Sequence, residues 1–121
     1  MKLLRLQHVA VTVPADRLEE ARAFYTGVLG LTETPRPPEL DRPGIWYTFG
    51  STELHIQARE TAPEPDDRHP AFIVDDIPAW RAHLRQVGID VCDQPTIFGR
   101  VRFDFRDPFG NRIELMTEGD R

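Results

Sequence analysis

The chain has 121 residues, the length of one ordinary domain, and 40% of them are hydrophobic, enough for a core without a disulfide or a structural metal. The formal net charge is −5 with acids and bases interspersed, so no basic stripe could follow a phosphate backbone and nucleic acid is excluded as a partner. No apolar run approaches the roughly 20 residues that span a bilayer, and no small-residue cleavage site follows the start, so we expect a cytoplasmic protein without a membrane partner.

The chain opens with a predicted strand and a predicted helix. Apolar residues alternate from Leu6 to Val13, which predicts a strand with its valines on one face and His8 on the other. The next segment carries apolar residues at helical spacing, and Gly27 or Gly30 can end it. The residues predicted for the buried side of this helix are Leu18, Ala21, Phe24, Tyr25 and Val28.

Further strands are predicted after a proline-rich stretch at residues 35–43. Two of them cover residues 44–49 and 52–58, and Gly50-Ser51 forms the turn between them. We expect three strands in this part of the chain, which completes a strand, a helix and three strands.

The second half repeats this order. Residues 68–74 predict a strand. The next helix is expected to begin at a cap formed by Asp75 or Asp76, with Pro78 in its first turn, where no amide donor is needed. Gly88 is expected to end this helix. Its predicted buried stripe is Ile77, Trp80, Leu84 and Val87, and three strand patterns follow at residues 89–93, 101–105 and 112–117.

An internal duplication of about 60 residues is the simplest account of this repeated order. In the alignment of the two halves, His69 falls on His8 and Val74 falls on Val13. The expected fold class is therefore α+β, one domain over residues 1–121 built from two βαβββ modules. The first module covers about residues 1–58, an acidic linker residues 59–68, and the second module about residues 69–121.

Strand parity places four potential metal ligands on one face of the predicted sheets. The helix of each module must cover one face, and the valines of the opening strand are its natural surface. His8 and His69 then point to the opposite, concave face. The closing strands add His55 and Glu114 to that face, and the symmetry of the modules would bring the four side chains together at the module interface.

These side chains suit a divalent metal ion. Neutral imidazole and carboxylate are donors for zinc, nickel, cobalt, manganese or ferrous iron, and two histidines with one carboxylate leave positions free for a substrate. A single strand histidine is more often a hydrogen-bonded core or surface residue, but three on one predicted face favour a metal site. Glu114 lies on a strand that is predicted to be buried, and a buried carboxylate needs a cation or a proton. His83, beside the helix stripe, is assigned no role.

Cys92 is the only cysteine of the chain. No intramolecular disulfide can form, which indicates a reducing compartment. We expect Cys92 to be a small buried hydrophobic residue rather than a nucleophile, because no histidine or basic cluster lies near it in sequence.

The segment from Phe105 to Leu115 resembles the D-P-x-G-N-x-I-E-L ending of vicinal oxygen chelate proteins, the superfamily of glyoxalases, bleomycin resistance proteins and extradiol dioxygenases. In this segment Asp107-Pro108 starts a tight turn, and Gly110-Asn111 is expected to accept positive backbone angles, so that the turn delivers the following strand in a fixed register. Further matches lie at residues 8–11, 24–25, 28–31, 54–56 and 69–76, so the resemblance covers nearly the whole chain.

The resemblance implies two βαβββ modules whose curved sheets form a cup around one divalent ion, in a chain that assembles as a homodimer. It implies that His8, His69 and Glu114 are metal ligands. His55 matches a position that is glutamate in glyoxalase I and is not a ligand in some other branches. Glu53 has the same face parity and lies two residues away, so it is the rival for that fourth position.

The activity that the resemblance implies is metal-dependent lyase or isomerase chemistry on a small oxygen-bearing substrate, through an enolate or related oxyanion. Glu114 would also be the catalytic residue that moves a proton. Candidate substrate walls are Trp46, Phe49, Phe98 and Arg102. Glyoxalase I itself is disfavoured, because His55 replaces its carboxylate and no motif marks a glutathione pocket. The alternatives are a ferrous extradiol dioxygenase, a fosfomycin-type thiol transferase and a metal-free drug-binding protein of the bleomycin-resistance type.

Overall fold

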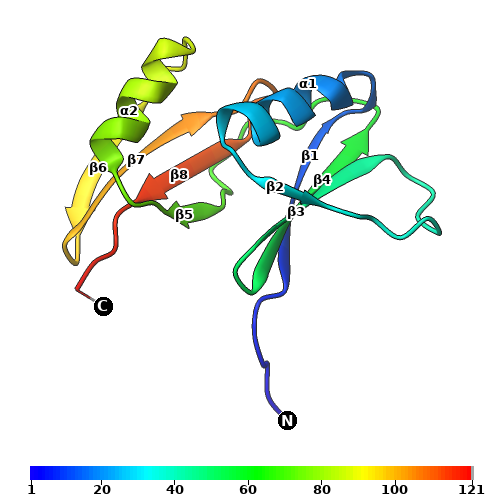
Figure 1. Cartoon of the computed structure of the whole chain (residues 1–121), viewed down its shortest axis with the longest axis horizontal. Helices are drawn as coiled ribbons and strands as arrows, with labels where there is room; N and C mark the ends of the chain where they lie inside the picture. Colours follow the sequence, from blue (N-terminus) through cyan, green and yellow to red (C-terminus); the bar gives the residue numbers. More distant parts are fainter. Residues whose placement is uncertain (121) are drawn as a thin grey trace. The chain divides into compact units, whose positions relative to one another are not determined.

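The computed structural model describes residues 1–120, which form two units with their boundary between Pro63 and Glu64. Each unit contains a four-stranded mixed sheet and a helical segment (Figure 1). The strand order is β1-β4-β3-β2 in the first unit and β5-β8-β7-β6 in the second, so both sheets have one topology. The predicted α+β fold of two βαβββ modules is confirmed, and the boundary falls inside the predicted linker at residues 59–68.

The sheet of the first module is built around its last strand. That strand, β4 (Thr52–Arg59), pairs in parallel with β1 (His8–Pro14) and antiparallel with β3 (Gly44–Phe49). The edge strand β2 (Thr32–Thr34) pairs with β3. Gly50 has a φ of 56° in the β3–β4 turn, a left-handed conformation that glycine adopts without a steric penalty.

The helical segment of the first module changes geometry along its length. A 3₁₀ turn (Ala15–Arg17) leads into α1 (Leu18–Arg22), which continues as a π-helical turn (Ala23–Val28). The segment ends before Gly30, whose φ is 71°. Of the predicted stripe, Ala21, Phe24 and Tyr25 are buried, whereas Leu18 and Val28 are half-buried.

The second module has the same pairing pattern. Its last strand β8 (Arg112–Met116) pairs in parallel with β5 (Ala71–Ile73) and antiparallel with β7 (Arg100–Arg106). The edge strand β6 (Cys92–Ile97) pairs with β7, and the helix α2 (Ile77–Gln86) follows β5.

Two strands of the second module differ from their predicted ranges. The strand predicted at 68–74 is confined to Ala71–Ile73, and Pro70 before it has no amide hydrogen to donate to a ladder. The strand predicted at 89–93 begins only at Cys92, because the Ile89 amide donates to the Leu84 carbonyl at 2.9 Å and closes the end of α2. Both differences have the same kind of cause: a backbone amide hydrogen that the strand would need is absent at Pro70 or bonded to α2 at Ile89.

Two burial predictions in this module are wrong. Val87 is 46% exposed, because α2 ends at Gln86 and the chain turns at Gly88, whose φ is 84°. Cys92 is also exposed, at the start of the edge strand β6, which has a neighbouring strand on one side alone. Cys92 is therefore not the buried hydrophobic residue that we expected.

In each module the core lies between the helical segment and one face of the sheet. In the first module the Tyr25 and Tyr47 rings are 6.2 Å apart, and the hydroxyls of Thr26 and Tyr47 are within 2.8 Å. In the second, the Arg81 guanidinium lies 5.0 Å from the centre of the Phe103 ring. The large buried apolar residues of the sheets are Val11, Val13, Ile45, Tyr47, Leu54 and Ile56, and Phe103, Phe105, Ile113 and Leu115. The predicted parity of the opening strands agrees with the burial of β1 and with the half-buried Phe72 of β5. In the closing strands, His55 and Glu114 on the opposite face are buried as well.

The cap of α2 provides a test of how the helix is stabilised. Asp76, not Asp75, is the cap, because its carboxylate accepts the Ala79 amide hydrogen at 3.0 Å. Asp76→Ala is expected to lower the free energy of unfolding by about 1 kcal/mol in urea denaturation. Asp75→Ala removes the same charge without the cap and is the matched control. Equal losses in the two variants would contradict the assignment.

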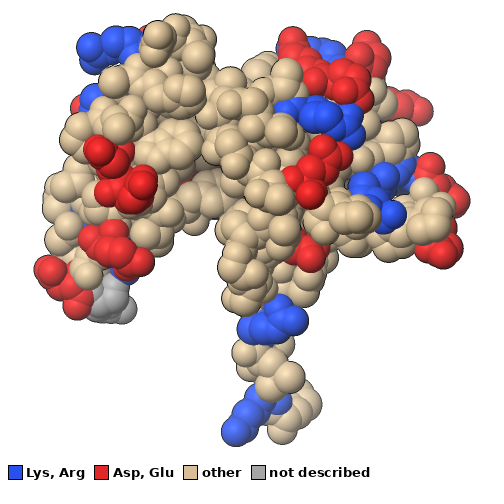
Figure 2. All heavy atoms as spheres, in the orientation of Figure 1, with Lys and Arg blue, Asp and Glu red and all other residues tan. Residues whose placement is uncertain are grey.

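On the face shown in Figure 2, Lys and Arg form small, separate patches and no continuous basic surface. Over residues 1–120, no helix combines the length and the hydropathy that a membrane span requires.

Candidate functional site

The turn before β8 is held by one buried carboxylate. Asp107 accepts the amide hydrogens of Phe109 at 2.9 Å and Asn111 at 2.8 Å, and the Asn111 side-chain amide donates to its second oxygen at 2.9 Å. Gly110 has a φ of 96°, as predicted. Asn111 does not have a positive φ, which corrects the expectation for this residue, because its side chain is engaged by Asp107 instead. The turn therefore enters β8 in a fixed register.

β8 carries Glu114, the most buried carboxylate of the predicted ligand set, at 3% exposure. Its Oε1 lies 3.1 Å from His69 Nε2, and its Oε2 lies 3.3 Å from Arg102 Nη1. His69 precedes β5, the parallel neighbour of β8, and Arg102 lies on β7, the antiparallel neighbour. Two strands and the segment that precedes β5 thus position a carboxylate between an imidazole and a guanidinium.

The tautomer of His69 is determined by its other nitrogen. Nδ1 lies 2.6 Å from the Asp67 carbonyl oxygen, which can only accept, so Nδ1 carries the hydrogen. In the neutral ring Nε2 then presents a lone pair to Glu114 Oε1, and two acceptors that face each other repel. A proton or a metal cation between them removes that repulsion. A backbone carbonyl that orients the ring in this way is a common feature of metal-binding histidines.

A second ion pair neutralises the rest of this face. Arg112 Nη2 donates to Asp104 at 2.8 Å, and this bond raises the pKa of Arg112. Gln94 also donates to Asp104 at 2.8 Å. Asp104 is thus paired with Arg112 and Gln94, and Glu114 is the carboxylate on this face that contacts an imidazole.

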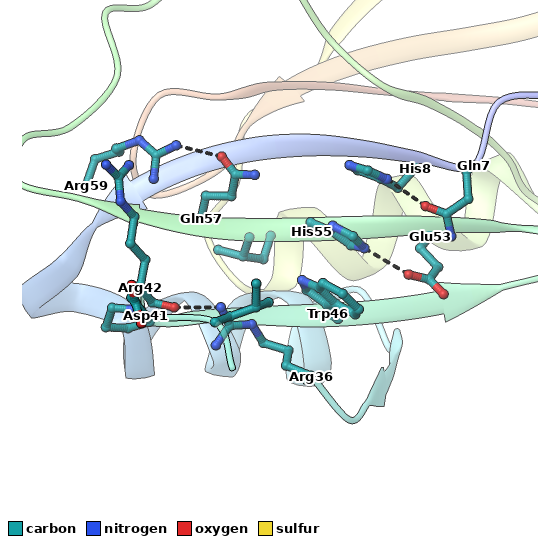
Figure 3. A pocket seen from close by; sticks show the side chains of 13 residues that line it. Gln7, His8, Arg36, Asp41, Arg42, Trp46, Glu53, His55, Gln57 and Arg59 are labelled. Carbon is teal, nitrogen blue, oxygen red and sulfur yellow. Dashed lines mark hydrogen bonds and ion pairs between the residues drawn. The ribbon is translucent and has the colours of Figure 1, made fainter. Parts of the chain in front are cut away.

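The other two predicted ligands lie in a stack of aromatic rings in the first module. The His55 ring is 4.0 Å from His8 on one side and 4.1 Å from Trp46 on the other, with interplanar angles of 14° and 4° (Figure 3). His55 Nε2 lies 2.8 Å from Glu53, and this hydrogen bond is the main cause of a lowered pKa of the Glu53 carboxyl. His8 Nδ1 is 2.6 Å from the Gln7 side-chain oxygen, so its Nε2 is the nitrogen available to a ligand.

Strand register identifies the equivalent of Glu114 in the first module. Ala71 on β5 pairs with Glu114, and Ala10, the matching residue on β1, pairs with His55. His55 therefore occupies the position of Glu114, whereas Glu53 lies two residues earlier. Strand parity left the choice between His55 and Glu53 open, and the strand register favours His55.

An open pocket of about 620 Å³ lies beside this stack in the first module (Figure 3). One end is formed by His8, Trp46, Glu53 and His55, and the other by arginines. Other residues that line it are Gln7, Leu40, Asp41, Pro43, Ile56 and Gln57. Trp46, one of the predicted wall residues, lines this pocket.

The other predicted wall residues lie elsewhere. Arg102 binds Glu114 and also donates to the Pro95 carbonyl at 2.8 Å. Phe98 is 57% exposed in the β6–β7 turn, where its φ is 48°, and Phe49 ends β3. Neither phenylalanine lines the pocket.

The structure brings the potential metal ligands together in pairs rather than in larger groups. Over the described residues 1–120 there is no group of three or more His, Cys, Asp or Glu side chains arranged to hold a metal. The pairs are His69 with Glu114 and His55 with Glu53. The Asp67 carbonyl, which orients His69, was missed by sequence reasoning, and no residue type signals it because it is a backbone atom.

Comparison with known proteins adds an independent finding. Residues 5–115 match the family model of the Glyoxalase/Bleomycin resistance protein/Dioxygenase superfamily. The chain is 28% identical over 128 residues to Glyoxylase I 4 of Arabidopsis thaliana, with 97% of this chain and 72% of that protein covered.

Solved structures share the fold. A glyoxalase family protein from Bacillus anthracis is 39% identical, with a TM-score of 0.88 and 98% of each chain covered. A mutant fosfomycin resistance protein from Listeria monocytogenes, complexed with Mn(II) and 1S,2S-dihydroxypropylphosphonic acid, has a TM-score of 0.81 over 96% of this chain and 93% of that chain. At 15% identity, this second likeness is one of fold alone.

Proposed function

The chain belongs to the Glyoxalase/Bleomycin resistance protein/Dioxygenase superfamily, and from that membership we propose that it is a divalent-metal-dependent enzyme. Its substrate is a small oxygen-bearing molecule, and its reaction is of the lyase or isomerase type, with negative charge developing on a substrate oxygen. We include in the proposal a cytoplasmic location and a homodimer.

The observation that carries the proposal is the contact between His69 Nε2 and Glu114 Oε1 at 3.1 Å. The Asp67 carbonyl leaves a lone pair on that nitrogen, so the pair fits a cation such as zinc, nickel, manganese, cobalt or ferrous iron. His8 and His55 are the further ligands that we propose. The Listeria protein with Mn(II) supports this proposal, since a divalent ion is compatible with the same fold.

A bound divalent ion would supply Lewis-acid stabilisation of negative charge on the substrate, worth several kcal/mol. The residues of the chain orient the ligands and move the proton. Asp67 holds the His69 ring in one tautomer, and Arg102 holds the Glu114 carboxylate in one orientation. Glu114 is the group that accepts and returns the substrate proton, a role that typically contributes about 10² to 10⁴ in rate.

Metal content tests the proposal directly. The protein, purified without a histidine tag, is expected to contain or take up one divalent ion per chain at a slight molar excess, as measured by elemental analysis and calorimetric titration. A protein that stays metal-free under these conditions would contradict the proposal and favour the binding-protein alternative.

The fourth ligand can be tested separately. His55→Ala is expected to weaken metal binding about tenfold, in competition with a chromophoric chelator, without abolishing it. Glu53→Gln is the control, because it removes a carboxylate but keeps an oxygen acceptor for the His55 ring. If Glu53→Gln weakens binding more than His55→Ala does, then Glu53 is the ligand and the register argument is wrong.

A further inference from the structure

The end of the first-module pocket away from His55 is formed by three arginines that have no carboxylate partner within residues 1–120. Arg36 Nη2 donates to the Arg42 backbone carbonyl at 2.6 Å, and its buried Nε has no hydrogen-bond partner. Arg59 donates to the Ala58 carbonyl and to the Gln57 side-chain oxygen, both at 2.8 Å. The acceptors of the Arg36 and Arg59 guanidiniums are thus uncharged, and no carboxylate of the described residues neutralises them.

The carboxylates of the same pocket do not neutralise this charge. Glu53 is engaged by His55 at 2.8 Å. Asp41 lines the pocket but forms no ion pair with the arginines in the described chain. Some arginines elsewhere do have acidic partners, as Arg22 has in Glu33 and Arg112 in Asp104. This end of the pocket therefore keeps an excess of positive charge.

Two of the arginines are held in place, Arg36 by the Arg42 carbonyl and Arg59 by Gln57. Figure 3 shows Arg42 and Arg59 extending toward the same end of the pocket. Trp46 and His55 lie at the opposite end, where they line the pocket with an aromatic surface. A guanidinium is a planar fork of donors whose geometry matches the oxygens of a carboxylate or a phosphonate.

We propose that this pocket binds an anionic substrate, with a carboxylate or phosphonate group on Arg42 and Arg59 and an apolar body against Trp46. The inference rests on the proposed function, because it takes the bound anion to be part of the substrate of that enzyme. It narrows the substrate class from oxygen-bearing molecules in general to small oxyanions with an apolar body.

Fluorescence of Trp46 tests the inference. The chain has two tryptophans, so a Trp80→Phe background leaves Trp46 as the only reporter. In this background, EDTA-treated protein is titrated with phenylacetate, with phenylphosphonate, and with the neutral 2-phenylacetamide. We expect at least one of the two anions to change the emission of Trp46 and to bind at least about tenfold more tightly than the amide, equivalent to about 1.4 kcal/mol. The anion that binds more tightly shows whether the pocket prefers a carboxylate or a phosphonate.

Matched variants locate the anion. Arg42→Gln and Arg59→Gln are each expected to weaken the tighter anion about tenfold. Arg85→Gln, on α2, makes the same change of charge at a residue that does not line the pocket and is expected to leave the affinity unchanged. Circular dichroism confirms that each variant is folded.

Three results would overturn the inference: no binding of either anion at millimolar concentration, equal binding of anions and amide, or unchanged affinity in both pocket variants. Because the titration uses protein without metal, it is independent of the metal test. Metal uptake without anion binding would remove this inference alone, whereas anion binding without metal uptake would remove the proposed enzyme function alone.

Discussion

Glu114→Gln is expected to lower the affinity for a divalent ion at least about 100-fold while the fold persists. The substitution preserves the shape of the side chain but removes the negative charge that faces His69 Nε2. Loss of an outer-shell partner alone typically costs about 10-fold to 100-fold in metal affinity, so loss of a ligand charge should cost at least the upper value. The measurement is calorimetric titration with Zn²⁺ or Mn²⁺, with circular dichroism to follow the fold.

Three further variants complete this test. Glu118→Gln removes the charge of an exposed carboxylate near the end of the chain and is expected to leave metal binding unchanged. His69→Ala and His8→Ala are expected to remove most of the metal, as Glu114→Gln does. Full metal occupancy in Glu114→Gln would refute the ligand assignment.

Asp107→Ala is expected to lower the free energy of unfolding by about 3 kcal/mol. Asp107 is buried, and its carboxylate accepts two backbone amide hydrogens and one side-chain amide hydrogen. Hydrogen bonds to a charged group contribute about 1.5–3 kcal/mol each, and the buried donors left without an acceptor add a penalty. The measurement is urea denaturation, compared with the parent chain.

Asp107→Asn is the matched variant. It keeps one oxygen acceptor for the amides of Phe109 and Asn111 but loses the acceptor for the Asn111 side chain, so we expect an intermediate loss. A loss below about 1 kcal/mol in Asp107→Ala would show that the carboxylate does not hold this turn.

The elements with a strong apolar period were predictable from the sequence. The alternation of residues 8–13 placed the valines toward the core and His8 away from it, and the burial of β1 agrees. The turn residues before β8 were predictable for a similar reason, since their chemistry is local to the chain. The repeated order of elements, which the two sheets confirm, followed from the same local patterns.

Elements without such a period were not predictable. β2 (Thr32–Thr34) is polar and too short to establish an alternation. The start of β6 depended on whether the Ile89 amide would close α2 or join the sheet, and the apolar pattern does not distinguish these two uses. The exposure of Cys92 followed from that shift, because it became the first residue of an edge strand.

The candidate site was predictable in residue type but not in arrangement. Parity put His55 and Glu53 on one face and could not choose between them, whereas the pairing of Ala10 with His55 favours His55. The arginine end of the pocket was not predicted, because Arg36 and Arg42 lie in a proline-rich segment whose path no periodicity describes.

Anomalous X-ray scattering from crystals of the protein loaded with zinc or manganese locates the ion itself and so tests whether His69 and Glu114 bind it. We expect one anomalous peak at bonding distance, about 2.0–2.2 Å for zinc, from both His69 Nε2 and a Glu114 oxygen. A saturated crystal with no peak between these two atoms, or with its metal bound elsewhere, would contradict it.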